Sequence, residues 1–165
     1  MTRELAPAPL TAEAFSAFGD VIEASDRAQQ IPINYGHTLR FHDLAQLDVA
    51  DQDGRAIVSL FRAEPLAPPL LTVFERHPLG SQAFFPLQGR PYLVAVAPAG
   101  AWDPAGVQLF RAGPGQGVNY RKGTWHHFLL PLEARSDFLV IDRAGPGDNL
   151  DEVHLVEADQ ILVRL

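Results

Sequence analysis

The 165-residue chain contains no cysteine. This absence excludes disulfide bonds, thiolate zinc sites, iron–sulfur clusters and cysteine nucleophiles. Positive charge is also scarce, because 13 Lys and Arg stand against 20 Asp and Glu, for a net charge of −7. Binding to nucleic acid phosphates needs clustered positive charge. We therefore expect no nucleic acid partner.

Long apolar runs are missing as well. No stretch approaches the roughly 18 apolar residues of a membrane span. Residues 1–10 include Arg3 and Glu4 and lack the apolar core of a signal peptide. The hydrophobic share of 47% and the charged share of 20% are typical of a folded globular chain. These observations predict a cytoplasmic protein with no membrane partner, and the length predicts a single domain over residues 1–165.

Glycine and proline, in contrast, are plentiful. The chain has 13 Gly and 14 Pro, which leave little room for long helices. Apolar and β-branched runs between these residues predict about ten short strands, the pattern of a mainly β barrel or sandwich. The runs lie at residues 20–23, 38–42, 56–62, 70–77, 82–87, 91–97, 107–111, 117–120, 125–130 and 137–142.

One short helix is predicted near the N-terminus, over residues 12–18. Thr11 can cap its first turn, and Gly19 is a typical stop residue. Phe15 and Phe18 are three residues apart and share one face of such a helix. We expect this face to pack against the β domain.

The run at residues 71–77 carries the first candidate chemistry. Side chains alternate between the two faces of a strand, so Glu75 and His77 share a face with Leu71 and Val73. If that face points inward, Glu75 and His77 enter the interior, where they must be paired or bound to a metal. The alternative is that Phe74 points inward and both polar side chains lie in water.

The run at residues 125–130 carries the second. His126 and His127 are adjacent, so at most one of them can point into the interior. A histidine among aromatic residues is more often a packing residue than a ligand. The charged pair Asp142 and Arg143 is interpreted as solvated surface, as are the charges of residues 148–152.

The spacing of the first polar run matches the first cupin motif. That motif places His-x-His before a Glu after four residues and a Gly after six more. In this chain Glu75, His77, Gln82 and Gly89 occupy those positions, so the spacing is kept and two residue types are changed.

The second cupin motif, a Gly followed three residues later by a His, is matched by Gly123 and His126. The chain therefore resembles the cupins, and the resemblance implies a cupin-like antiparallel β-barrel of the jelly-roll type with the short N-terminal helix.

Within the cupins, the chain resembles the ureidoglycolate lyase family, also called ureidoglycolate hydrolases. The resemblance extends over nearly the whole chain, and its most specific parts are Glu-Arg-His-Pro-x-Gly-x-Gln-Ala-Phe and Gly-Val-x-Tyr before Trp-His. These parts lie at residues 75–84, 117–120 and 125–126, with further matches at residues 14–23, 41–44 and 137–143. The resemblance implies a homodimeric lyase of allantoin degradation, in purine catabolism, that cleaves ureidoglycolate to glyoxylate and urea.

That reaction needs a base for the substrate hydroxyl and an acid for the departing urea nitrogen. Glu75, His77 and His126 are the candidate catalytic residues, with the roles of acid and base left open. An arginine fits the substrate carboxylate as a fork of donors. The candidate substrate-binding residues are Asn34, Arg40, Arg62, Gln82 and Tyr120.

The same cluster could hold a metal. Glu75, His77, Gln82 and His126 all carry oxygen or nitrogen donors for a divalent ion. Gln82 is a neutral, weak ligand where cupins carry a charged one, so we expect at most a weakly bound ion such as Ni²⁺. A non-catalytic small-molecule-binding cupin, for sensing or storage, is the alternative function. The changed ligands count against a metal-dependent isomerase or dioxygenase.

Overall fold

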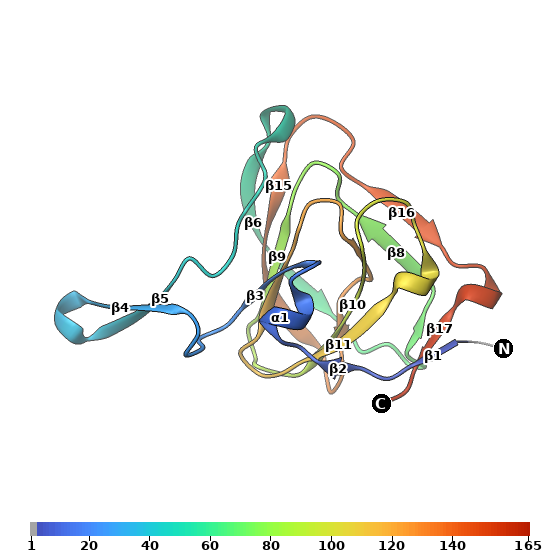
Figure 1. The fold of residues 1–165 in the computed structure, drawn as a ribbon, viewed down its shortest axis with the longest axis horizontal. Helices are drawn as coiled ribbons and strands as arrows, with labels where there is room; N and C mark the ends of the chain where they lie inside the picture. The colour runs from blue at the N-terminus through green and yellow to red at the C-terminus, as the bar shows by residue number, and fades with distance from the viewer. Residues whose placement is uncertain (1–2) are drawn as a thin grey trace.

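Two large β-sheets pack face to face in this computed structural model, which describes residues 3–165 (Figure 1). The seven-stranded sheet has the order β16–β8–β13–β10–β11–β2, with β14 also paired to β10. Its strands are β2 (Ala8–Pro9), β8 (Val73–Arg76), β10 (Tyr92–Ala97), β11 (Gln108–Ala112), β13 (Trp125–His126), β14 (Leu130–Pro131) and β16 (Asp151–His154). The mainly β, cupin-like class expected from the sequence is confirmed, although the strands form separate sheets and not one closed barrel.

The second large sheet has five strands, and the remaining sheets are smaller. The five-stranded sheet has the order β3–β12–β9–β15–β6, and its strands are β3 (Gly19–Ile22), β12 (Gly117–Tyr120), β9 (Gln82–Pro86), β15 (Ser136–Ala144) and β6 (Arg55–Ala63). A three-stranded sheet contains β1 (Arg3–Leu5), β17 (Ile161–Val163) and β7 (Leu70–Leu71). Within residues 3–165, four short 3₁₀ helices occupy connections: η1 (Asn34–Gly36), η2 (Asp51–Asp53), η3 (Pro104–Gly106) and η4 (Glu157–Asp159).

The helix α1 (Ala12–Phe15) is shorter than predicted. Thr11 caps it as expected, because its side-chain oxygen accepts from the amide of Ala14 at 3.1 Å. After α1 the hydrogen bonds change to the i→i−3 pattern, and the amide of Phe18 donates to the carbonyl of Phe15 three residues back. This tighter turn brings both phenylalanines into the core, with ring centroids 5.7 Å apart.

Two hydrophobic cores lie on opposite sides of the seven-stranded sheet. The first fills the space between the two large sheets and includes Val94 and Val96 of β10 and Val118 of β12. The second lies on the outer side and joins Leu93 of β10 to Ile161 of β17. Every residue of β10 is therefore buried, which explains its uninterrupted apolar sequence.

The second core resolves the question of which face of the run at residues 71–77 points inward. Phe74 is fully buried in that core, where its ring lies 4.9 Å from the ring of Trp102. Glu75 is on the opposite face of β8 and is only partly exposed. Burial of Phe74 therefore does not place Glu75 in water, because both faces of β8 are covered.

Replacing Phe74 with alanine should lower the free energy of unfolding by about 3–5 kcal/mol, because a fully buried ring leaves a cavity that its neighbours cannot fill. Urea denaturation measures this change. Leu87→Ala is the control, since Leu87 is 51% exposed and its truncation should cost less than about 0.5 kcal/mol. Equal losses for the two variants would contradict the second core.

Two of the predicted strands are interrupted. The run at residues 70–77 divides into β7, which pairs with β17, and β8, which pairs with β13 and β16. The run at residues 125–130 divides into β13 and β14, which pair with the two ends of β10. A change of partner breaks each strand, and alternation along the sequence does not reveal such a change.

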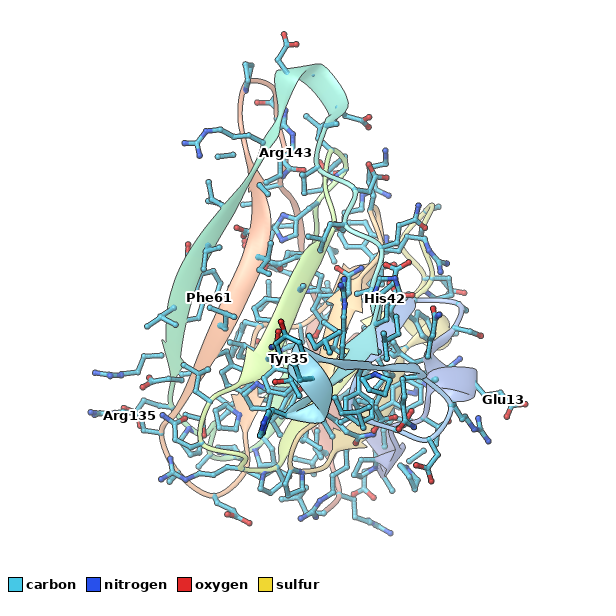
Figure 2. All side chains as sticks on the ribbon, turned by 90° about the vertical axis from the view of Figure 1, so that its left-hand side faces the viewer. Glu13, Tyr35, His42, Phe61, Arg135 and Arg143 are labelled. Carbon is cyan, nitrogen blue, oxygen red and sulfur yellow. The ribbon has the colours of Figure 1, made fainter. Side chains whose placement is uncertain are left out.

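A hairpin that the sequence did not predict in full extends away from the two sheets (Figure 1). It consists of β4 (Gln29–Ile33), which was missed, and β5 (Thr38–His42), which was expected. At its tip Asn34 and Tyr35 have positive φ angles, and Tyr35 is fully exposed, in front of the body in Figure 2. None of the helices between residues 3 and 165 has the length and apolar character needed to cross a membrane.

Candidate active site

Three titratable side chains meet on the inner face of the seven-stranded sheet. His126 of β13 pairs directly with Glu75 of β8, and His77 follows the end of β8. One nitrogen or oxygen atom from each of the three lies within 4.8 Å of the others. The structure thus brings together all three of the catalytic residues predicted from the sequence.

Glu75 and His126 line a central cavity of about 270 Å³ between the two sheets, and His77 adjoins these two residues without being part of the lining. This volume is near the lower end of the range for small-molecule sites, about 300–1,000 Å³. Gln82 of β9 and Tyr120 of β12, two of the predicted substrate-binding residues, are directly paired across strands and lie on its wall. The residues lining the central cavity are Phe61, Arg62, Ala63, Glu75, Gln82, Phe84, Tyr120, His126, His127, Phe128 and Leu129.

Glu75 is the carboxylate of the cluster. Its partial burial raises its pKa above the usual 4.5, the nearby His77 opposes this shift, and the negative charge of Glu152 on the neighbouring strand adds to it. The Glu75 Oε1 atom lies 3.9 Å from Nε2 of His77. A carboxylate with a raised pKa is a better proton acceptor than an ordinary surface carboxylate.

His126 is held as a neutral ring. Burial lowers its pKa to about 3, and the charge of His77 adds to this effect. Its Nδ1 donates to the carbonyl of His127 at 3.3 Å, so Nε2 carries the lone pair. The Nε2 atom is buried and has no hydrogen-bond partner among residues 3–165. The ring of Tyr120 stacks on that of His126, with centroids 4.3 Å apart and planes inclined by 11°.

The imidazole ring of His127 points to the other side of the sheet, although the residue also borders the central cavity. Its ring packs edge-on against Phe74 at 5.7 Å, in the second core. Burial lowers its pKa to about 4, so it is also neutral at pH 7. The alternation of strand side chains therefore directs the His126 ring to the cluster with Glu75 and His77, and the His127 ring to the packing around Phe74.

His126→Ala should reduce turnover more than His127→Ala does, because only the His126 ring joins the cluster of Glu75 and His77. The measurement is kcat for the two purified variants, with thermal unfolding as the check on folding. If His127→Ala had the larger effect on kcat, the assignment of the inner histidine would be wrong.

The two neutral histidines should also make the fold less stable in acid. Both rings take up a proton near pH 6.5 when the chain unfolds, whereas in the folded chain their pKa values are about 3 and 4. Their contribution is therefore fully present above pH 6.5 and falls by about 1.4 kcal/mol per pH unit for each histidine below it. Urea denaturation at several pH values measures the slope. His127→Phe should reduce the slope, and an unchanged slope would contradict this origin.

His77 is fixed by hydrogen bonds at both ring nitrogens. Nδ1 donates to the carbonyl of Asn149 at 2.8 Å, and Nε2 lies 3.1 Å from Oε1 of Gln82. The Gln82 amide nitrogen in turn donates to Oδ2 of Asp142 at 3.1 Å. The side chain of Asn149 also accepts from the amide of Leu79, which holds the chain after His77 in place.

The sequence prediction missed Asp142 and Asn149. Asp142 was interpreted as solvated surface, but it is partly buried and bonded to Gln82. Arg143 was interpreted in the same way and is only 7% exposed, because carbonyl oxygens of Asp51, Gln52 and Pro146 satisfy its guanidinium. No local pattern marks Asp142 or Asn149, because Gln82 is 60 residues from Asp142, and His77 and Leu79 are 72 and 70 residues from Asn149.

The predicted substrate-binding residues fall into two groups. Arg62 lies on the wall of the central cavity, where its guanidinium makes two hydrogen bonds to the carboxylate of Asp137. Asn34 and Arg40 lie instead on the exposed β4–β5 hairpin, away from the central cavity of their own chain. Arg76 is next to Glu75 in the sequence but lies on the opposite face of β8, where its guanidinium carbon is 4.6 Å from the centre of the Trp125 ring.

Comparison with known proteins identifies the family. The family model described as Ureidoglycolate lyase matches residues 2–162. The chain belongs to the ureidoglycolate lyase family. A ureidoglycolate lyase of Burkholderia mallei (strain NCTC 10229) is 57% identical over 151 residues, which cover 91% of this chain and 88% of that protein. Ureidoglycolate lyases of Pseudomonas putida (strain W619) and Pseudomonas syringae pv. tomato are 50% and 52% identical over 163 residues, 98% of this chain and 97% and 95% of theirs.

These matches confirm the family resemblance that the sequence motifs indicated, and they confirm the expected enzyme class, a lyase. The family name does not specify a metal, but the donor atoms of the cluster show how well a metal ion would fit. The buried, unpartnered Nε2 of His126 and the carboxylate of Glu75 suit a divalent ion. Nε2 of His77 is already bonded to Gln82, whose amide is held by Asp142. The residues therefore do not fit a tightly held resident metal as they are arranged.

Proposed function

We propose that the chain releases urea from ureidoglycolate to give glyoxylate, in the central cavity and by acid–base elimination. The observation that carries this proposal is the meeting of Glu75, His77 and His126 within 4.8 Å, in a chain of the ureidoglycolate lyase family. The enzyme is a single cupin-like domain over residues 1–165 that acts in the cytoplasm, in allantoin degradation.

The elimination moves two protons at one carbon. Glu75 takes the proton from the substrate hydroxyl, and the oxygen lone pair then forms the carbonyl of glyoxylate while the carbon–nitrogen bond breaks. His77 delivers a proton to the departing nitrogen, which leaves as neutral urea. This assignment follows from the raised pKa of Glu75 and from the two acceptor oxygens that face the ring of His77.

The remaining groups hold the substrate. Burial raises the pKa of Tyr120, so its hydroxyl keeps its proton and can donate a hydrogen bond. Nε2 of His126 accepts one from a urea N–H, since its lone pair is free. Arg62 is the arginine on the cavity wall and binds the substrate carboxylate by turning from Asp137.

A homodimer would explain why the β4–β5 hairpin extends from the sheets with exposed apolar side chains. Tyr35 and Leu39 are exposed on it, and Val58 and Leu60 are exposed on β6, which is an edge strand of the five-stranded sheet. An exposed apolar edge strand presents unpaired backbone groups with which another chain can pair. A second copy would cover both surfaces and bring Asn34 and Arg40 against a partner. Sedimentation should show a dimer, and a monomer at micromolar concentration would contradict this part of the proposal.

A divalent ion such as Ni²⁺ would be held weakly. Glu75 and His126 offer free donor atoms, but His77 must first give up Gln82. When bound, such an ion would supply Lewis-acid stabilisation of substrate oxygens. Calorimetric titration of the protein with Ni²⁺ measures its affinity.

The decisive test is release of glyoxylate and urea from each enantiomer of ureidoglycolate, after chelation and after addition of Ni²⁺, Mn²⁺ or Zn²⁺. Release of both products above the uncatalysed rate, from one enantiomer in preference, is the expected result. No release under any of these conditions would overturn the lyase proposal. The non-catalytic alternative is not favoured, because family and cluster both point to catalysis.

A larger hollow of about 820 Å³ lies at the base of the hairpin and is a poor site for this substrate. Its walls carry the acidic side chains of Glu13, Glu23, Asp26 and Asp43 and one arginine, Arg27. An anionic substrate is repelled by such a lining. The smaller central cavity is therefore the better candidate.

A further inference from the structure

Asp142 sits behind the catalytic cluster and does not line the central cavity. It lies on β15, where the pairing of Ile141 with Ala83 brings Asp142 opposite Gln82 of β9. Its Oδ2 accepts from the Gln82 amide nitrogen at 3.1 Å, and its Oδ1 is buried without a hydrogen-bond partner among residues 3–165. A partly buried carboxylate with one bond is costly to keep, so a role in the site would account for it.

The direction of this hydrogen bond decides how Gln82 is turned. A carboxylate oxygen only accepts, so the Gln82 end that faces Asp142 must be the NH₂ group. The other end, Oε1, then faces Nε2 of His77 at 3.1 Å. Because a carbonyl oxygen also only accepts, Nε2 of His77 is the donor of that bond. If the Gln82 amide were reversed, its oxygen would face the oxygen of Asp142.

We propose that Asp142 is a positioning residue that fixes the amide of Gln82, and through it the proton on Nε2 of His77. This proposal rests on the function proposed above, in which His77 delivers a proton to the departing nitrogen. Asn149 holds the opposite side of the ring, because its carbonyl accepts from Nδ1 at 2.8 Å, so the two bonds together hold the ring with a proton on each nitrogen. The chain from Asp142 through Gln82 thus keeps a proton on the ring nitrogen that lies closest to Glu75.

Two substitutions at Asp142 distinguish a role in orienting Gln82 from a role in stabilising the fold alone. Asp142→Leu removes the acceptor and should lower kcat by about 10–100-fold with little change in KM, the scale expected when a reacting group is displaced. Asp142→Asn keeps an oxygen that can accept from Gln82 and should restore most of that loss. Asp148→Leu is the matched control, because Asp148 is an exposed carboxylate beyond the same strand, and it should leave kcat unchanged.

A spectroscopic readout tests the proton itself. In protein labelled with ¹⁵N-histidine, the ring nitrogens of His77 are assigned by comparison with His77→Gln. The wild-type and Asp148→Leu proteins should show a protonated Nε2, and Asp142→Leu should show that signal shifted or broadened. If Asp142→Leu does not fold, Gln82→Leu breaks the same chain one link later and should change the Nε2 signal in the same way.

Normal kcat and unchanged His77 signals in Asp142→Leu would overturn the proposal. Equal loss of kcat in the Leu and Asn variants, with the Nε2 signal unchanged, would also overturn it, since that outcome indicates support of the fold alone. The ring-nitrogen signals do not depend on turnover. A wild-type protein without lyase activity would therefore refute the proposed function while leaving the hydrogen-bond chain measurable.

Discussion

Glu75→Gln should lower kcat by about 10²–10⁴-fold, the usual loss when a positioned acid or base is removed. Glutamine keeps the size of the side chain and cannot take up the hydroxyl proton. The fold should be retained, because removing a charge close to Glu152 relieves a repulsion between two paired strands. Turnover of the preferred enantiomer, with thermal unfolding in parallel, measures both effects.

The pH profile adds a second readout for the same residue. A base must be ionised to act, so kcat/KM should rise as the pH increases through the pKa of Glu75, which lies above the usual 4.5. The residual activity of Glu75→Gln should lack this acid limb. Glu152→Gln is the matched control, because Glu152 is the exposed carboxylate paired with Glu75 on β16. A large loss of kcat in Glu152→Gln, or a normal rate in Glu75→Gln, would contradict the assignment.

The sequence could predict that Glu75, His77 and His126 lie together, because they lie within short, regularly spaced segments. Alternation along one strand placed Glu75 and His77 together, and the second cupin motif supplied His126. The family resemblance was equally accessible, since its motifs are contiguous. The hydrogen bond that supports the cluster from behind could not be predicted from the sequence. Asp142 reaches Gln82 through the register of β9 and β15, which depends on how the whole five-stranded sheet is paired.

The substrate-binding predictions show a different limit. Gln82 and Tyr120 follow from strands whose ends meet at the central cavity. The prediction that Asn34 and Arg40 bind substrate depended only on the chemistry of their side chains. The hairpin that carries them places both away from the central cavity of the same chain. Composition and charge cannot say which way a hairpin extends, because that depends on contacts outside the segment, and here on contacts proposed with a second copy.

His77→Ala should reduce kcat by about 10²–10⁴-fold as well, because it removes the group that delivers a proton to the departing nitrogen. The substitution also opens a space between Gln82 and Asn149, which hold the ring by its two nitrogens. Free imidazole fits that space and should restore part of the rate in proportion to its concentration. His154→Ala is the control, since His154 is exposed on β16, and it should neither lose activity nor respond to imidazole.

The double variant Glu75→Gln/His77→Ala tests whether the two groups act together. If both act in one transition state, removing the second group after the first should cost far less than it does in the wild-type protein. The double variant should then be about as slow as the slower single variant, and imidazole should no longer restore its rate. If the two losses multiplied in full, Glu75 and His77 would contribute independently of each other, and the proposed coupling of the two proton transfers would be wrong.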